Sequence, residues 1–333
     1  MEIEDRKITK YQQQYINYLN KKRITESTKI MRLAAFRCLF NEYNVNLPKN
    51  HKFNLINYRI RNKNLPTWND VRNSLEYCKT SRDKAIISFL ATSGLRESDI
   101  LGFTIKDMIN ATSIYHNGSL KDLLSKNPKN IVPCWDFYPL KTRKRGNLCI
   151  TFNTGECTQF IFQHLKERLQ TNELITPKSP LFYGRKKPHF LTTDSIIKLC
   201  QRLNKELKLG KDINRKYGKF RAQNLRKLFS TTCRRNITNV VINRNKFSEL
   251  DIISIFTGHT PPNMSNSEVY DAVEDDNPNS YLRKNYESLI PYLTIFKDET
   301  NNEVKNNNQT IESEILKIKE SVDILLNNKN IVS

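Results

Sequence analysis

The stretch Ser93-Gly94-Leu95-Arg96-Glu97-Ser98-Asp99 combines a helix break with a charged pair of side chains. Glycine adopts positive φ without strain, so Gly94 predicts the end of a helix over residues 82–92, and Leu95-Arg96 begins the next helix. Asp99 follows Arg96 by three residues, which places both side chains on one helix face, where the carboxylate can orient the guanidinium. A guanidinium held in this way can bind two oxygens of one phosphate. Taken alone, however, a segment of this kind is more often the start of a helix without a functional role.

The residues around this stretch predict a mainly helical region with one small sheet. Thr67-Trp68-Asn69-Asp70 resembles a capping box before a helix. Apolar residues alternate with polar ones before and after a tight basic turn at Arg143–Asn147, which predicts a β-hairpin that carries Lys141-Thr142. We expect further helices around Cys157–Leu169, Thr193–Leu207, Ala222–Arg234 and Ser248–Phe256. The fold class that follows is mainly α with a small antiparallel β-sheet (α+β).

Composition and helix-breaking residues divide the chain into four parts. Residues 1–47 predict two amphipathic helices, and residues 48–66 form a basic linker that contains two prolines. Residues 67–297 form the main domain. Residues 298–333 contain an Asn-rich linker and a short amphipathic helix with heptad spacing, which can pair with a second copy or pack on its own chain. The apolar faces expected for the first two helices are Tyr11, Tyr15, Tyr18 and Leu19, and Met31, Ala35, Cys38 and Leu39.

The net charge of the chain limits the partners that it can have. The 55 Lys and Arg residues outnumber the 34 Asp and Glu residues, which gives a formal charge of +21, and residues 1–297 alone carry +24. A domain this basic favours a polyanion as its partner, and nucleic acid is the commonest one. We find no basic amphipathic helix with an apolar insertion face, no apolar stretch long enough to span a membrane, and no glycine-rich phosphate loop. A membrane protein, a dinucleotide enzyme and a P-loop NTPase are therefore disfavoured.

The seven cysteines form an odd set without C-x-x-C spacing. This pattern argues against a zinc ribbon or a disulfide framework and suits a reducing cellular interior. We expect all of them to be small buried apolar residues, at positions 38, 78, 134, 149, 157, 200 and 233.

Further motifs follow Arg96 in a fixed order. They are Lys141-Thr142 on the hairpin, Gln223-Asn224-Leu225-Arg226-Lys227 on a helix, Gly258-His259 after another helix, and Tyr270 eleven residues later. In this order and spacing they resemble the tyrosine recombinase family, the phage-integrase type of site-specific recombinase, over residues 65–296. Lys141-Thr142 with Ile150-Thr151-Phe152, and the ending from Tyr286 to Ile295, resemble integrases of archaeal viruses and plasmids. The resemblance implies a helical N-terminal core-binding domain, which clamps DNA, and a catalytic domain over residues 67–297.

The resemblance also implies a role for each of these side chains. Arg96 and Arg226 would clamp the scissile phosphate, with Asp99 as an orienting group, and His259 would help to stabilise the negative charge of the pentacoordinate transition state. Tyr270 would attack phosphorus and form a 3′-phosphotyrosyl link. Lys141, helped by the neighbouring cations Arg143, Lys144 and Arg145, would protonate the leaving 5′-oxygen. No metal, nucleotide or other cofactor is then expected.

Gln223 departs from the family pattern, which usually has His or Lys at this place. Glutamine donates a hydrogen bond to a phosphate oxygen but cannot carry a proton. Either Gln223 only positions the phosphate, or Lys219 or Lys227 supplies the missing proton transfer. Three further alternatives stay open: Tyr281 or Tyr286 as the nucleophile, Lys144 in place of Lys141, and His259 as a helix C-terminal cap.

The function that the resemblance implies is that of an integrase, which cleaves and rejoins double-stranded DNA at attachment sites and so integrates or excises a viral or plasmid genome. Recombination joins two duplexes through four active sites, which implies a homotetramer on DNA. The expected location is the cytoplasm of the host cell, in association with the nucleoid. One rival is a type IB topoisomerase-like enzyme with the same tyrosine chemistry. The other rival is a DNA-binding relative that has lost catalysis, which Gln223 suggests.

Overall fold

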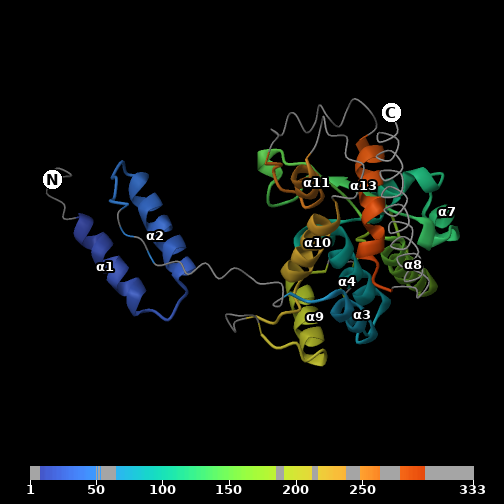
Figure 1. Cartoon of the computed structure of the whole chain (residues 1–333), viewed down its shortest axis with the longest axis horizontal. Coiled ribbons are helices and arrows are strands. Elements are labelled where there is room, and N and C mark those ends of the chain that lie inside the picture. Colours follow the sequence, from blue (N-terminus) through green and yellow to red (C-terminus); the bar gives the residue numbers. More distant parts are fainter. Residues whose placement is uncertain are drawn as a thin grey trace, which may run out of the picture. The chain divides into compact units, whose positions relative to one another are not determined.

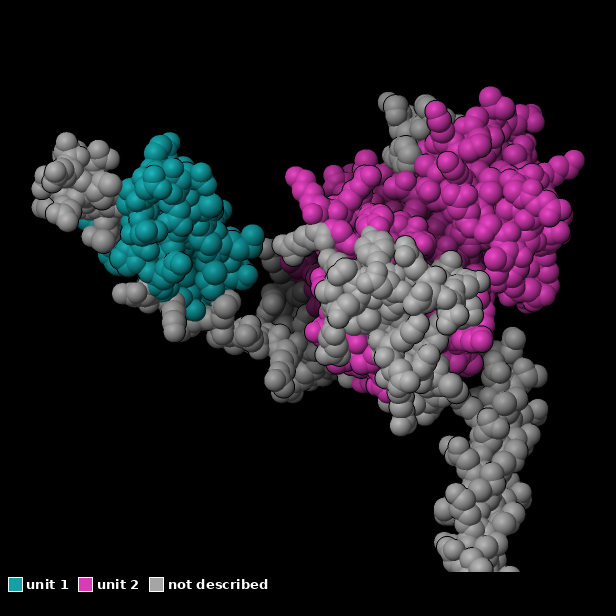
Figure 2. Space-filling model, turned by 90° about the horizontal axis from the view of Figure 1, so that it is seen from above, with its two compact units in different colours: residues 1–60 teal, residues 61–333 magenta. Residues whose placement is uncertain are grey.

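The computed structural model describes residues 8–49, 51, 53, 65–184, 191–211, 217–237, 248–262 and 278–296. By its internal contacts the chain forms two compact units, residues 1–60 and 61–333 (Figure 2). Most of the described residues are helical, and two short strands form an antiparallel sheet (Figure 1). The predicted fold class, mainly α with a small antiparallel sheet, is confirmed.

The first unit contains helices α1 (Ile8–Lys21) and α2 (Glu26–Asn41). The hydroxyl of Thr25 caps α2 by accepting a hydrogen bond from the backbone N–H of Thr28. The apolar faces predicted for the two helices are largely wrong, because two helices that pack side by side bury a narrow stripe. That stripe forms a small core of Ile16, Leu19, Leu33 and Phe53. Residues of the predicted faces that are exposed instead are Tyr11, Tyr18, Met31, Ala35, Cys38 and Leu39.

The second unit begins with helices α3 (Trp68–Glu76), α4 (Ser81–Ser93), α5 (Glu97–Gly102), α6 (Ile105–Ala111) and α7 (Leu120–Ser125). Strands β1 (Cys134–Phe137) and β2 (Cys149–Phe152) follow, and then helices α8 (Gly155–Gln170), α9 (Thr193–Glu206), α10 (Ala222–Asn236), α11 (Glu249–Phe256) and α13 (Pro278–Leu293). The helices predicted for this unit are confirmed, with small differences at their ends. Thr67 and Asp70 form the predicted capping box at the start of α3.

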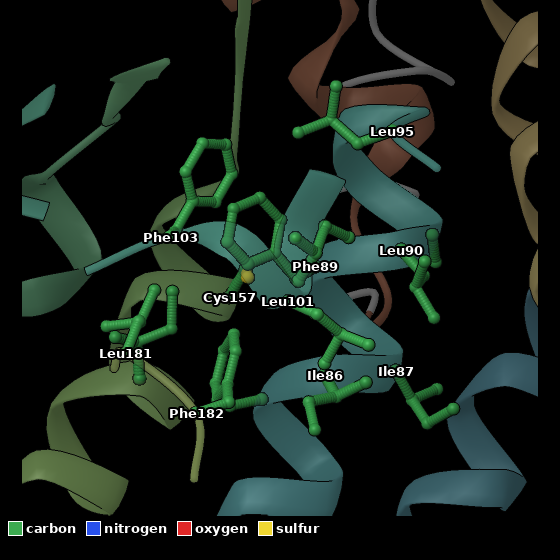
Figure 3. Close-up of a cluster of buried hydrophobic side chains, with 14 of the residues drawn as sticks. Ile86, Ile87, Phe89, Leu90, Leu95, Leu101, Phe103, Cys157, Leu181 and Phe182 are labelled. Atoms are coloured by element: carbon green, nitrogen blue, oxygen red, sulfur yellow. The ribbon is translucent and has the colours of Figure 1, made fainter. Parts of the chain in front are cut away.

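Helix α4 forms the centre of the second unit. Its residues from Ala85 to Ser93 are all buried, because α3, α8 and α10 pack around it. Figure 3 shows Phe89 of this helix beside Phe103, and the two rings stack with centroids 5.9 Å apart. A helix that is buried on all sides holds its ends in fixed positions, and the C-terminal end of α4 leads directly into Gly94 and Arg96.

The two strands pair in register from Cys134 with Phe152 to Phe137 with Cys149. The hairpin was predicted, but its tight turn is wrong: residues 138–148 form a longer loop with a 3-10 turn at Arg143–Arg145. Pro139 has no N–H to extend the ladder, and the backbone N–H of Leu140 donates to Asp99 instead of to the opposite strand. Lys141-Thr142 therefore lies in this loop and not in a strand.

A second apolar cluster holds β2 together with α10, α11 and α13. Phe229 of α10, Phe256 of α11 and Tyr286 of α13 are all fully buried there, and the Tyr286 ring lies against Phe152 of β2 at a centroid distance of 5.2 Å. Every residue of β2 is buried, so the predicted alternation of polar and apolar residues fails on this strand. The reason is that helices cover both of its faces: α11 and α13 pack on Ile150 and Phe152, and Thr151 donates to the Ser93 carbonyl of α4.

Candidate active site

Three of the predicted site residues meet where helix ends come together. Arg96 precedes α5, Arg226 lies on α10, and His259 follows α11. Lys141 is exposed in the loop between β1 and β2 and is close enough for its charge to act on His259. Segments that are far apart in the sequence thus place four basic side chains in one region.

The end of α4 is shaped to receive Arg226. Gly94 ends this helix with φ +68°, and a Cβ at this position would lie only 2.2 Å from Cδ1 of Phe229. Glycine is therefore required both for the conformation and for the close approach of α10. The Gly94 carbonyl accepts a hydrogen bond of 2.8 Å from Nη1 of Arg226, and Nη2 donates to the carbonyl of Thr257 at the end of α11. Arg226 thus joins the C-terminal ends of two helices.

A second glycine positions His259. Gly258 has φ +59°, and a Cβ there would lie 2.8 Å from Cγ of Pro139, so only glycine lets the chain turn this close to the β1–β2 loop. The backbone N–H of His259 then donates to the Ser254 carbonyl at 2.9 Å, which fixes the residue against the last turn of α11. The imidazole extends from this point toward Arg226.

The hydrogen bonds of His259 define its tautomer. The Thr257 hydroxyl donates to the carbonyl of Ile253 at 2.7 Å, so its oxygen is free to accept a hydrogen bond from Nδ1–H of His259 at 2.9 Å. Nε2 of His259 lies 3.1 Å from Nη2 of Arg226 and accepts a hydrogen bond from it. This arrangement satisfies both ring nitrogens only when the imidazole is neutral.

Asp99 links Arg96 to the loop that carries Lys141. Its carboxylate is buried, with Oδ2 3.7 Å from Nη1 of Arg96 and Oδ1 accepting a 3.1 Å hydrogen bond from the backbone N–H of Leu140. Burial raises the pKa of Asp99, and the Leu140 hydrogen bond and the charges of Arg96 and Arg226 oppose that effect. Arg96 is therefore oriented by Asp99, and its side chain remains 18% exposed at the site.

The electrostatics of the site favour an anion. Burial, and next the charge of Arg96, lowers the pKa of Arg226 to about 10, so the guanidinium stays charged at neutral pH. Burial, followed by the charges of Arg226, Arg96 and Lys141, lowers the pKa of His259 to about 4, so the imidazole is neutral. Bringing these cations together costs free energy that a bound phosphate group would recover.

Solved structures with a similar fold are recombinases and integrases. One is the XerA recombinase, which is 16% identical; the match covers 80% of this chain and 82% of that chain, with a TM-score of 0.39. Another is the XerH site-specific recombinase bound to difH substrate, which is 16% identical; the match covers 78% of this chain and 67% of that chain, with a TM-score of 0.45. The Tn1549 transposon integrase in complex with transposon right end DNA is 13% identical; the match covers 80% of this chain and 84% of that chain, with a TM-score of 0.48. This is the class of protein that the sequence motifs resemble. No family model and no curated protein matches the sequence.

The remaining predicted residues lie on the helix that carries Arg226, in the loop that carries Lys141, or outside the described residues. Gln223 is exposed on α10, one turn before Arg226. Lys144 is exposed in the β1–β2 loop, as Lys141 is. Tyr270 falls in residues 263–277, outside the part of the chain that the structure describes, and so do the C-terminal heptads and the side chains of Arg145 and Tyr281.

Tyr286 is excluded as an alternative nucleophile by its position. Its side chain is fully buried, and its hydroxyl donates a 2.7 Å hydrogen bond to the Thr92 carbonyl in the interior. Burial raises the pKa of this hydroxyl well above its usual value, which opposes formation of a phenolate. Tyr286 is a core residue of α13.

The sequence analysis missed Thr257 and the backbone of Leu140. Thr257 holds both His259 and Arg226, and the N–H of Leu140 connects Asp99 to the lysine loop. The Thr257 contact with Arg226 uses a carbonyl and the Leu140 contact uses a backbone N–H, so neither can be read from residue type, whereas the Thr257 contact with His259 uses the side-chain hydroxyl. The only signal for Thr257 is its position two residues before His259, at the end of a helix.

The described residues contain no grouping of three or more His, Cys, Asp or Glu side chains that could hold a metal ion. Among the described helices, none has both the length and the apolar character that crossing a membrane requires. Five of the seven cysteines are buried, as predicted, and Cys134 is half-buried. The prediction is wrong for Cys38, which is exposed on α2.

Proposed function

We propose that this chain is a tyrosine-type site-specific DNA recombinase, an integrase that cleaves and rejoins DNA to integrate or excise a viral or plasmid genome. The observation that carries the proposal is the meeting of Arg96, Arg226 and His259 beside the Lys141 loop, in the order in which the sequence motifs predict them. Two guanidinium groups can bind the oxygens of one phosphate and stabilise extra negative charge during its reaction, and the neutral imidazole of His259 holds one of them, Arg226, in place.

In this proposal Tyr270 supplies the nucleophile. Its hydroxyl releases its proton to water and its oxygen attacks phosphorus, the bond from phosphorus to the 5′-oxygen breaks, and Lys141 gives that oxygen a proton. Because the new bond to tyrosine keeps the phosphorus in an ester, a 5′-hydroxyl of the partner strand can rejoin the DNA in the reverse reaction. No nucleotide is consumed, and every group assigned to stabilise charge is a side chain of this protein.

The charge of the chain supports double-stranded DNA as the partner. Residues 1–297 carry +24, and this excess attracts phosphates whatever their base sequence. We propose that four copies assemble on two duplexes, with residues 1–47 as the clamp, residues 48–66 as the linker and residues 67–297 as the catalytic domain. The site of action would be the nucleoid in the cytoplasm of the host cell, and the mobile element one of the archaeal viral or plasmid type.

One observation favours a second function, that of a DNA-binding relative without catalysis. Gln223 is exposed and one helical turn from Arg226, where it can contact a phosphate but cannot exchange a proton with it. A chain of this kind would bind DNA without cutting it.

Covalent trapping separates the two functions. The full chain is incubated with a pool of nicked duplexes of random sequence, in which a short strand is lost on cleavage so that the enzyme stays attached. We expect a covalent protein–DNA adduct with the wild type and with Tyr281→Phe, and none with Tyr270→Phe. An adduct that survives Tyr270→Phe would contradict the assignment of the nucleophile, and its absence from the wild type would support the non-catalytic function.

A further inference from the structure

The loop between β1 and β2, residues 138–148, is fastened near both of its ends. Near the first end the backbone N–H of Leu140 donates a 3.1 Å hydrogen bond to the buried carboxylate of Asp99. Near the second end Nδ2 of Asn147 donates a 3.0 Å hydrogen bond to the hydroxyl of Thr260. We call these two hydrogen bonds the loop tethers.

Asn147 forms its tether from a buried position. Asparagine is mostly exposed in proteins, but Asn147 is only 4% exposed. Its Nδ2 bonds to a residue 113 positions later in the chain, and this residue, Thr260, directly follows His259. A hydrogen bond between segments so far apart in the sequence fixes the loop against the chain that follows α11.

Each loop tether ends on a segment that also positions a residue of the candidate active site. Asp99 orients Arg96, with Oδ2 of the carboxylate 3.7 Å from Nη1 of the guanidinium. Thr260 follows His259, and Nε2 of this histidine accepts a hydrogen bond from Arg226. The loop is therefore tied to the surroundings of both arginines, so its position follows theirs.

The loop needs fastening because of its charge. Residues 141–146 contain four basic side chains and no acidic one, and like charges so close together repel one another. Lys141 is exposed, so packing does not hold its side chain in place. The N–H of Gly146 donates to the Arg143 carbonyl at 3.1 Å, which shapes the turn inside the loop. The position of this turn relative to the site is set by contacts at its two ends, among which are the loop tethers.

We propose that Asn147 is a positioning residue for the transfer of a proton from Lys141 to the leaving 5′-oxygen. This inference rests on the proposed function, because it requires Lys141 to act as the general acid. A general acid must lie within about 2.6–3.2 Å of the atom that it protonates, and proton transfer of this kind contributes about 10²–10⁴-fold to a rate. Without its tether the loop also occupies positions from which Nζ of Lys141 does not reach the oxygen, so part of that factor is lost.

The test compares two leaving groups on one DNA. A duplex recovered from the covalent adducts of the random pool is synthesised with either oxygen or sulfur as the atom that bridges phosphorus and the 5′-carbon at the scissile position. Attack by Tyr270 breaks the P–O bond in one form and the P–S bond in the other. The 5′-oxygen needs a proton as it leaves, whereas a thiol with a pKa of about 8.5 leaves as the thiolate without one. A defect in proton transfer therefore appears on the oxygen substrate and not on the sulfur substrate.

Two variants remove the second loop tether from opposite sides. Asn147→Ala removes the donor, and Thr260→Val removes the acceptor by a change at an exposed residue. Lys141→Ala shows the pattern of a missing general acid. Asn236→Ala is the matched control, because Nδ2 of this half-buried asparagine donates to the Thr232 carbonyl at the end of α10. Thermal melting of the full-length proteins establishes that every variant is folded.

On the oxygen substrate we expect Asn147→Ala and Thr260→Val to cleave about tenfold more slowly than the wild type, and Lys141→Ala to be slower still. On the sulfur substrate all three should cleave within about threefold of the wild type, and Asn236→Ala should match the wild type on both. The double variant should be no slower than the slower single variant, because both changes remove the same hydrogen bond. In the free protein, hydrogen exchange of the backbone amides of residues 140–148 should be about tenfold faster in both tether variants.

The outcome separates this inference from the proposed function. If Asn147→Ala cleaves the oxygen substrate at the wild-type rate, or loses the same factor on both substrates, the positioning role is refuted while the proposed function stands. If the random pool yields no covalent adduct with the wild type, the proposed function fails, and the role of Asn147 fails with it.

Discussion

Replacing Arg226 with lysine keeps one positive charge but removes the planar guanidinium, whose several N–H donors connect the segments of the site. The guanidinium donates to three acceptors on two segments: the Gly94 carbonyl, the Thr257 carbonyl and Nε2 of His259. A lysine ammonium carries its donors on one atom and cannot reach both helix ends in this geometry. At least one carbonyl in the part-buried site would lose its partner.

The size of the effect follows from these contacts. Leaving one buried acceptor unpaired costs about 1–3 kcal/mol of folding free energy, which is less than the ~5–15 kcal/mol by which natural domains are stable. The variant should therefore remain folded at 25 °C and melt a few degrees lower. Loss of a preorganised donor to the reacting phosphate costs about 10²–10³ in rate. Cleavage should therefore fall far more than stability.

The assay is covalent trapping on nicked duplexes in a single turnover, with thermal melting of the same preparations. Arg234→Lys is the matched control, because Arg234 is an exposed arginine in the last turn of the same helix. We expect Arg234→Lys to cleave at the wild-type rate. If Arg226→Lys is folded and cleaves within about threefold of the wild type, the cluster around Arg226 does not hold the scissile phosphate.

Four further results are expected. Thr257→Val removes the acceptor of the His259 Nδ1–H, so trapping should slow about three- to tenfold while DNA affinity stays the same in a gel-shift titration. Burial lowers the pKa of His164 to about 3, so between pH 6.5 and 3 the unfolded chain binds a proton that the native chain does not. Stability should then fall by about 2 kcal/mol from pH 7 to pH 5 through this residue, and urea unfolding of His164→Phe should lack that part of the loss. Cleavage should proceed in EDTA, and an absolute Mg²⁺ requirement would contradict the proposed site. The logarithm of the DNA affinity should fall with the logarithm of the salt concentration, with a slope of about −0.9 per phosphate contacted, and an affinity independent of salt would contradict DNA as the partner.

The parts of the fold that the sequence predicts are those set by local signals. Gly94 ends α4 because a positive φ is required there, and Thr67 with Asp70 begins α3 because the two side chains satisfy backbone groups within three residues. Arg96 and Asp99 share a face as their spacing predicts, and their charged atoms lie 3.7 Å apart. Each of these signals acts within one helix turn and can therefore be read without knowing the distant partners.

The parts that the sequence does not predict depend on distant partners. The alternation expected for β2 fails because α4, α11 and α13 together cover both faces of the strand. The tight turn fails because Leu140 bonds to Asp99, about forty residues earlier in the chain. On α2 the apolar face stays exposed because the first unit offers only α1 and a few residues after α2 to cover it. The role of Thr257 cannot be predicted from the sequence for the same reason, because its carbonyl accepts the hydrogen bond from Arg226 only when α10 packs beside α11.

The convergence of helix ends explains how two arginines can share this site before any substrate is bound. The carbonyl ends of α4 and α11 carry the negative end of each helix dipole, and both point at the guanidinium of Arg226. They stabilise its charge and fix its plane, while Asp99 does the same for Arg96 from the other side. The backbone and one buried carboxylate thus compensate part of the cost of placing the cations together. The positive charge that remains faces the open side of the site, where an anion completes the balance.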